Sequence, residues 1–407
     1  MNLKSKLLKR LQKYASFGVI PKLLLAPFAL VSILFFIVIR PVKTIKIYPV
    51  DWQLGHLLPM IHSNEFRKRE SNETRLTRIT FIYCLRGPIA NNFALRKLRD
   101  SVWIFTGHFS WLLIYFSNIF QPLIEYHERD NRTYEFLESD PLIAFSGKEQ
   151  AAGNEKINSL RPFVCLNVRD GAYTKQVRSE FKYSAFDWSL RNSDINTYSA
   201  ACESLFERGF RVIRMGAVVD NLLNSSNQKF VDYPNNGMRT EFLDFYLGHE
   251  CEFAISTSSG WDEIPTIFKK PLLLVNHFDF WRTLSKPCVV FPKKFINTQS
   301  QVSLGLNEII KLNADGKTNQ KKVNLNQLGI RVEDLSSEEL VEAVTEMAQR
   351  VEGTFVETPE QKEMQAKLKH ILSTHPKLQP SPNYYPIRAQ FASCFLSRYP
   401  NFLDGLD

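Results

Sequence analysis

The sequence lacks several patterns that mark common classes of enzyme. Its six cysteines contain no C-x-x-C pair, and no cluster of His and Cys has the spacing of metal ligands. It also has no G-x-G-x-x-G fingerprint, no G-x-S-x-G elbow and no D-x-D motif. These absences argue against a dinucleotide enzyme, a serine hydrolase and a metal-dependent enzyme. We therefore expect neither a cofactor nor a metal ion.

Acidic side chains are missing from the first 50 residues, which carry nine Lys or Arg side chains. The whole chain has 51 basic and 42 acidic side chains, so the residues after position 50 have equal numbers of each. A protein that binds nucleic acid usually carries its excess positive charge on the folded body. Here the excess lies beside the one long apolar run. The pattern favours a membrane surface as partner and argues against nucleic acid.

The apolar run is Leu23–Ile39, which as a helix would be about 25 Å long, at the short end of what crosses a bilayer. The stretch before it, Lys4–Lys13, is typical of a basic amphipathic helix on anionic headgroups. Residues 1–40 are therefore predicted to be a membrane-associated segment that serves as the anchor.

Whether the anchor spans the membrane stays open. Six basic residues before the run and three after it would favour a cytoplasmic N-terminus and an external body. Pro27 instead allows a kinked helix in the interface with both ends on the cytoplasmic side. Cysteines without paired spacing suit a reducing compartment. We expect the body to lie at the cytoplasmic face of the inner membrane.

The rest of the chain has the pattern of an α/β protein. Thr44–Val50 and Ile79–Tyr83 are predicted strands in an N-terminal α/β domain, residues 41–150. Residues 126–160 are polar, show little periodicity and suit a linker. From Arg161 on, short apolar strands alternate with helices, which is typical of a parallel, doubly wound sheet. These strands are Phe163–Val168, Phe210–Arg214, Cys251–Ser256 and Pro271–Val275. They predict a second α/β domain, residues 161–330.

Residues 331–407 are predicted to form a helical tail that packs back on the core. Ser336 with Glu339 forms a capping-box pattern for a first helix. Thr358-Pro359 with Gln361 forms a second such pattern.

Polar residues gather after the strands of the second domain, and ligands of open α/β sheets bind at the carboxyl ends of strands. Arg169, Asp170 and Gly171 follow one strand; Arg214 and Gly216 follow the next. Small hydroxylated residues and a glycine follow a third strand and lead into a helix containing Glu263, a candidate partner for a ribose diol. This turn is predicted to offer backbone N–H groups to an anion and consists of Ser256, Thr257, Ser258, Ser259 and Gly260. Together the clusters indicate a site for a phosphorylated ligand.

Several of these segments resemble a family of bacterial glycosyltransferases associated with surface-polysaccharide gene clusters. The matching segments are NVRDG (167–171), RNSDINTY (191–198), RMG (214–216), DY (232–233), FLDFYL (242–247) and FAISTSSG (253–260). The adjacent pair Arg169-Asp170 and the S-T-S-S-G turn are more distantly similar to fucosyltransferases. The resemblance implies a GT-B architecture of two Rossmann-like domains, with the acceptor on the first and the nucleotide-sugar donor on the second.

Under this resemblance the chain would transfer a sugar from a nucleotide-sugar donor to a lipid-linked or other glycan acceptor without a metal. Arg169, Arg214 and the turn 258–260 would stabilise the leaving diphosphate. His56, after the first strand, is the candidate general base, and Asp170 is its substitute. Asp194 and Asp232 are predicted either to orient sugar hydroxyls or to cap helices.

Two other classes remain open. One is another enzyme on the same architecture, such as a sugar-nucleotide epimerase or a pyruvyl transferase. The other is a non-catalytic membrane-bound scaffold with a degenerate nucleotide site.

Overall fold

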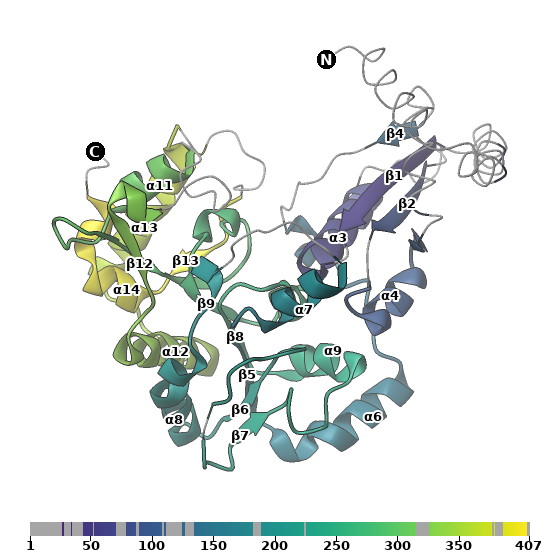
Figure 1. Cartoon of the computed structure of the whole chain (residues 1–407), viewed down its shortest axis with the longest axis horizontal. Helices are drawn as coiled ribbons and strands as arrows, with labels where there is room; N and C mark the ends of the chain where they lie inside the picture. Colours follow the sequence, from purple (N-terminus) through teal and green to yellow (C-terminus); the bar gives the residue numbers. More distant parts are fainter. Residues whose placement is uncertain are drawn as a thin grey trace. The chain divides into compact units, whose positions relative to one another are not determined.

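The chain divides into two compact units, Met1–Asp130 and Asn131–Asp407. The computed structural model (Figure 1) describes residues 44–51, 53–70, 79–86, 89–107, 124–126, 134–181, 189–223, 225–314, 325–376 and 386–404, together with Pro27, Leu34, Ser110 and Leu378. The predicted membrane-associated segment, residues 1–40, lies outside these residues apart from Pro27 and Leu34. Among the described residues, no helix has both the length and the apolar character needed to cross a membrane.

The first unit contains a four-stranded parallel sheet in the order β3-β2-β1-β4. Its strands are β1 (Thr44–Asp51), β2 (Ile79–Arg86), β3 (Trp103–Phe105) and β4 (Ile124–Tyr126). The first two contain the predicted strands, which are thereby confirmed. Between them runs helix α3 (Leu54–Glu70), and α4 (Asn92–Arg99) precedes β3. Both helices bury apolar side chains, such as Leu58, Ile61 and Leu98.

The second unit contains a seven-stranded parallel sheet in the order β13-β10-β9-β8-β5-β6-β7. Its strands are β5 (Phe163–Asn167), β6 (Arg211–Arg214), β7 (Phe230–Asp232), β8 (Ala254–Ser256), β9 (Leu272–His277), β10 (Val289–Pro292) and β13 (Gln390–Phe391). The chain runs outward from β5 to β7, then returns to β8 on the other side of β5. This confirms the predicted doubly wound sheet.

Near-continuous apolar sequence explains the centre of this sheet. Every residue of β5, β8 and β9 is buried, as expected for strands that helices cover on both faces. The helices are α6 (Gly147–Ile157), α7 (Ala172–Phe181), α8 (Ser199–Glu207), α9 (Glu241–Glu250), α10 (Glu263–Ile267), α11 (Leu306–Ala314), α12 (Ser337–Glu352), α13 (Pro359–Thr374) and α14 (Ser393–Arg398). Among them, α8 packs against α12, and α9 contacts both α6 and α10.

Residues 134–160 are not the linker that their polar sequence suggested. They belong to the second unit and include α6, which begins with a capping box formed by Ser146 and Glu149. The hydroxyl of Tyr246 on α9 donates to the carbonyl of Gln150 at 3.1 Å. The unit therefore begins earlier than the predicted boundary at residue 161.

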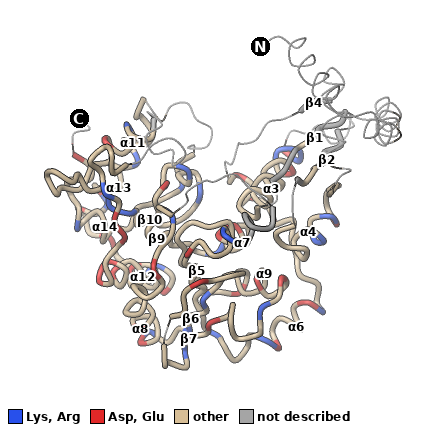
Figure 2. The backbone as a smooth tube through the Cα atoms, viewed as in Figure 1, with Lys and Arg blue, Asp and Glu red and all other residues tan. Residues whose placement is uncertain are grey.

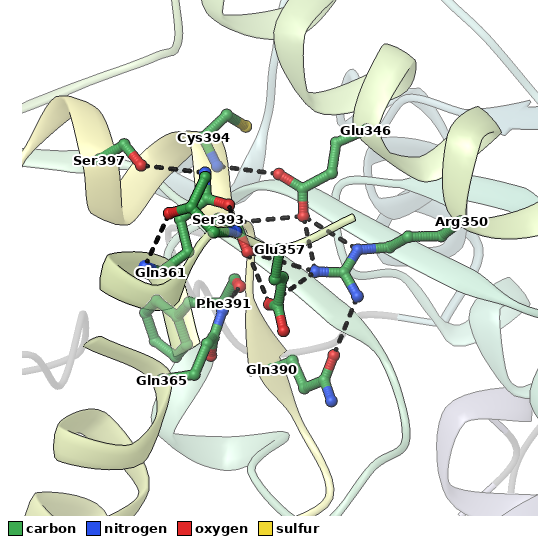
Figure 3. A network of polar contacts seen from close by, with 11 residues as sticks. Glu346, Arg350, Glu357, Gln361, Gln365, Gln390, Phe391, Ser393, Cys394 and Ser397 are labelled. Carbon is green, nitrogen blue, oxygen red and sulfur yellow. Dashed lines mark hydrogen bonds and ion pairs between the residues drawn. The ribbon is translucent and has the colours of Figure 1, made fainter. Parts of the chain in front are cut away.

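The C-terminal segment is built into the second unit through a buried carboxylate (Figure 3). Glu346 of α12 accepts the backbone N–H groups of Ser393 (3.0 Å) and Cys394 (2.8 Å) at the start of α14. The guanidinium of Arg350 donates to the same carboxylate at 2.9 Å and lies 3.4 Å from Glu357. A negative charge at a helix N-terminus is stabilising. The predicted caps of α12 and α13 are confirmed, although the tail also adds strand β13 to the sheet.

Candidate functional site

The order in which the chain adds strands to the large sheet reverses between β5 and β8. After β5 the chain adds β6 and β7 on one side, and it then adds β8 on the other side of β5. In open α/β sheets this reversal leaves a crevice at the carboxyl ends of the two strands, where ligands bind. Arg169 follows β5, and the turn 257–260 follows β8. The two segments are joined directly, because the Arg169 N–H donates to Oγ1 of Thr257 at 2.9 Å. The predicted gathering of these two clusters is therefore correct.

Arg169 is half-buried, and its guanidinium donates to two neutral oxygen atoms. Its Nε donates to Oδ1 of Asn192 at 3.2 Å, and its Nη2 donates to Oγ1 of Thr174 at 3.1 Å. Both partners orient the guanidinium without neutralising its charge. A cation held in this way suits an anionic ligand such as a phosphate.

A second arginine at the crevice, Arg191, was not among the predicted site residues. Its Nη2 donates to the carbonyl oxygen of Ser258 at 2.6 Å, and its Nε lies 3.6 Å from Oδ1 of Asp279 after β9. The side chain is 18% exposed. The sequence signal was present, since Arg191 opens the RNSDINTY segment, but nothing local connects it with a turn 67 residues away.

The turn after β8 differs from the predicted anion site. Ser258 has a positive φ of 64°, and the N–H of Ser259 donates to the carboxylate of Asp262 at 2.8 Å. Asp262 therefore occupies the position that an anion would take at this N-terminus. Ser256 and Thr257 are buried, so their side chains support the turn. The predicted donor-binding role of 256–260 through free backbone N–H groups therefore does not fit the Ser259 N–H, which Asp262 already occupies.

Arg214, predicted to bind diphosphate, is completely buried. Its guanidinium lies 3.7 Å from the carboxylate of Asp170 and 3.8 Å from that of Asp232, and none of its nitrogens has a hydrogen-bond partner among the described residues. Burial lowers the pKa of Arg214, although the two carboxylates oppose this change. The residue joins the ends of β5, β6 and β7, and direct contact with a ligand does not fit this geometry.

Asp170 is poorly placed to be a general base. Its Oδ1 accepts the N–H of Ala172 at 3.0 Å, and its Oδ2 accepts the N–H of Asp220 at 2.7 Å. With Arg214 also beside it, the carboxylate is occupied on both oxygens. It fixes the start of α7 and the loop after β6.

Glu263, predicted to hold a ribose, is 4% exposed. Its Oε1 accepts from Nζ of Lys286 at 3.2 Å and from the hydroxyl of Tyr134 at 3.0 Å. Nζ of Lys286 also lies 5.9 Å from the centroid of the Tyr134 ring. The carboxylate is thus held inside a buried ion pair, so the ribose role does not fit.

The remaining predicted residues have simpler surroundings. Asp194 accepts the N–H of Asn196 at 3.0 Å and caps a short 3₁₀ helix, as one of its two interpretations predicted. Asp232 accepts from the Asn235 amide at 2.9 Å. Gly216 has a φ of 154°, and a Cβ there would lie 2.8 Å from Val219, so packing alone explains the glycine. His56 lies in the first turn of α3, directly after β1, in the first unit.

A buried polar pair adjoins Arg191 at the end of β9. Nδ1 of His277 lies 3.6 Å from Oδ1 of Asp279, while Nε2 of His277 contacts the Thr283 hydroxyl at 2.8 Å. Burial lowers the pKa of His277 to about 4. Burial opposes ionisation of Asp279, but the charge of Arg191 nearby lowers its pKa below the ordinary value. Asp279 is therefore a carboxylate that steadies Arg191. In the described part of the chain, no three His, Cys, Asp or Glu side chains form a group suited to a metal ion.

Comparison with known proteins gives fold similarities only. No protein-family model and no curated protein matches the chain. A glycosyl transferase of family 9 from Veillonella parvula is similar in structure, with a TM-score of 0.42 and 8% identity over 75% of this chain and 98% of the other. The ADP-heptose LPS heptosyltransferase II of E. coli has a TM-score of 0.37 and 12% identity over 70% and 98%. The glycosyltransferase TibC of enterotoxigenic E. coli has a TM-score of 0.31 and 11% identity over 57% of each chain. None of these three TM-scores reaches 0.5, so the similarities carry no functional conclusion.

Proposed function

We propose that this protein is a glycosyltransferase whose second unit binds a nucleotide-sugar donor in the crevice between β5 and β8. The observation that carries the proposal is the pair of arginines, Arg169 and Arg191, at the point where the strand order reverses. Doubly wound sheets bind nucleotides at this point. The family resemblance of the surrounding segments agrees with this class of ligand.

The chemistry assigned to the two arginines is stabilisation of the departing diphosphate. When the glycosidic bond of the donor breaks, negative charge grows on the leaving phosphate. Guanidinium groups that are already in place stabilise this charge without reorganising. Two such cations serve this purpose without a metal ion. Arg214 and Asp170 then have a supporting role, because they hold the strand ends from which Arg169 projects.

The first unit is proposed to hold the acceptor, as in the GT-B architecture that the resemblance implies. His56, in the first turn of α3 after β1, is the proposed general base that takes the proton of the acceptor hydroxyl. The basic N-terminal segment is proposed to hold the enzyme at the cytoplasmic face of the membrane, where a lipid-linked acceptor of surface-polysaccharide synthesis would be available.

The test is a transfer assay with full-length protein in detergent. A panel of nucleotide sugars is incubated with lipid extracts that contain glycan acceptors, and released nucleoside diphosphate is measured. Release that depends on the acceptor and fails in Arg169→Ala and Arg191→Ala supports the proposal. Conversion of a nucleotide sugar without any acceptor indicates an epimerase instead. Folded protein that binds none of the nucleotides indicates a scaffold.

A further inference from the structure

Three consecutive residues, 191–193, contact the crevice from one side. Arg191 donates to the carbonyl of Ser258, and the Asn192 side chain accepts from the guanidinium of Arg169. The N–H of Ser193 donates to the carbonyl oxygen of Arg169 at 2.9 Å. We call these residues the 191–193 segment. The segment fixes both the backbone and the side chain of Arg169, and it also contains the second arginine, Arg191.

An ion pair from two later parts of the chain holds the 191–193 segment in turn. Lys293 directly follows β10, and Asp334 directly follows strand β12 (Ile330–Glu333). Nζ of Lys293 donates to the carbonyl oxygen of Asn192 at 2.7 Å and pairs with Oδ1 of Asp334. The other carboxylate oxygen of Asp334 accepts from the Ser193 hydroxyl at 2.8 Å. Each partner of the ion pair thus contacts this segment once.

We propose that Lys293 and Asp334 are positioning residues, which set the places of Arg169 and Arg191 through the 191–193 segment. The phosphate role of the arginines rests on the proposed function; the clamp formed by the ion pair does not. Neither Lys293 nor Asp334 is assigned any contact with the ligand. Asp334 belongs to the C-terminal tail, so the pair makes the geometry of the crevice depend on that tail.

The geometry favours positioning over a role in general stability. The Lys293 side chain is 4% exposed, whereas that of Asp334 is 32% exposed. When Lys293 is removed, the carboxylate of Asp334 is still in contact with water. The variant therefore leaves no uncompensated buried charge, which would by itself lower the stability of the fold. The next residue, Lys294, pairs instead with Glu339 of α12 at 2.9 Å. It supplies a control for lost stability, because Lys294→Met also removes a lysine–carboxylate pair in the same part of the fold. It leaves the buried carboxylate of Glu339, which keeps its hydrogen bonds from the Ser336 N–H and the Tyr399 hydroxyl.

The experiment compares Lys293→Met, Lys293→Arg and Lys294→Met in full-length protein. Affinity for UDP, GDP, ADP and TDP is measured by calorimetry. In Lys293→Met the affinity for whichever nucleotide the wild type binds is expected to fall on the order of 10- to 100-fold, because small displacements of positioning groups have effects of this size. Lys293→Arg retains the charge and the donors and should recover most of the loss. Lys294→Met should bind like the wild type.

Amide hydrogen exchange of the peptide 189–198 gives a readout that needs no ligand. We expect faster exchange at Ser193 in Lys293→Met and no change in Lys294→Met. Unchanged exchange together with unchanged affinity in Lys293→Met overturns the inference, as does failure of Lys293→Arg to recover binding. If exchange is faster in Lys293→Met but the wild type binds no nucleotide, the ion pair still holds the 191–193 segment. The proposed donor site is then wrong, and so is any effect of the Lys293–Asp334 pair on ligand binding.

Discussion

Removing the guanidinium of Arg169 should weaken donor binding while leaving the fold intact. A hydrogen bond to a charged group contributes about 1.5–3 kcal/mol. Since each 1.4 kcal/mol is about tenfold in affinity, Arg169→Ala should raise the Kd for the bound nucleoside diphosphate by roughly 10- to 150-fold. The side-chain partners that it leaves behind, Asn192 and Thr174, are only partly buried, so the free energy of unfolding should change little. Titration calorimetry measures the affinity, and urea denaturation measures the stability.

The same strand provides a matched control. Arg161 lies two residues before β5, at the amino edge of the sheet, and pairs there with Glu250. Arg169 lies two residues after β5, at the carboxyl edge. Arg161→Ala should therefore leave the Kd unchanged. Equal affinity of Arg169→Ala and wild type would refute the diphosphate role, and so would an equal loss in both variants.

A conservative variant separates charge from geometry. Lysine keeps the positive charge but has a single ammonium in place of the planar fork. Arg169→Lys should therefore recover only part of the affinity that Arg169→Ala loses. Full recovery would mean that the site needs a nearby charge only.

Three further predictions concern stability. Arg214→Met should lower the free energy of unfolding by about 3–5 kcal/mol in urea denaturation, because it leaves Asp170 and Asp232 without the buried cation between them; a loss below 1 kcal/mol would exclude this role. Glu346→Ala should cost about 1–3 kcal/mol and speed hydrogen exchange in α14, because a buried N–H loses its acceptor; unchanged exchange there would contradict the cap. His277 stays neutral in the native state down to about pH 4 but titrates near 6.5 when unfolded. Its contribution to the free energy of unfolding is therefore complete above pH 6.5 and is lost as the pH falls toward 4. In His277→Gln the fall in the free energy of unfolding between pH 6.5 and pH 4 should lose the part that His277 causes. An unchanged dependence of that free energy on pH would refute this role of His277.

The centre of the second unit was predictable from sequence because its strands have a simple physical signature. Strands buried on both faces read as near-continuous apolar runs, as in residues 163–168 and 271–275. The polar residues that end these runs must gather at one edge once the strands are parallel. Arg169 accordingly lies beside the turn after β8, as predicted.

Roles that depend on tertiary contacts could not be predicted. The sequence indicates that Arg214 ends a strand. It does not indicate that the guanidinium of Arg214 is buried between the carboxylates of Asp170 and Asp232. The capping-box spacing of Ser259 and Asp262 was a local signal that Asp262 takes the anion position of this turn, as it was for the caps of α12 and α13. Nothing local indicates that Lys286 pairs with Glu263. Helix α6 was missed because its polar surface hides the periodicity, although its capping box was present in the sequence.

The central claim is that a nucleotide binds in the crevice of the second unit without a metal ion. The most direct test is a thermal-shift panel on detergent-solubilised protein with UDP, GDP, TDP, CMP and their sugars, with and without EDTA. A ligand that binds only the native state raises the melting temperature by mass action. We predict that one nucleotide family stabilises the protein, that EDTA does not alter this shift, and that Arg191→Ala abolishes it. Folded protein that none of the nucleotides stabilises would contradict the claim.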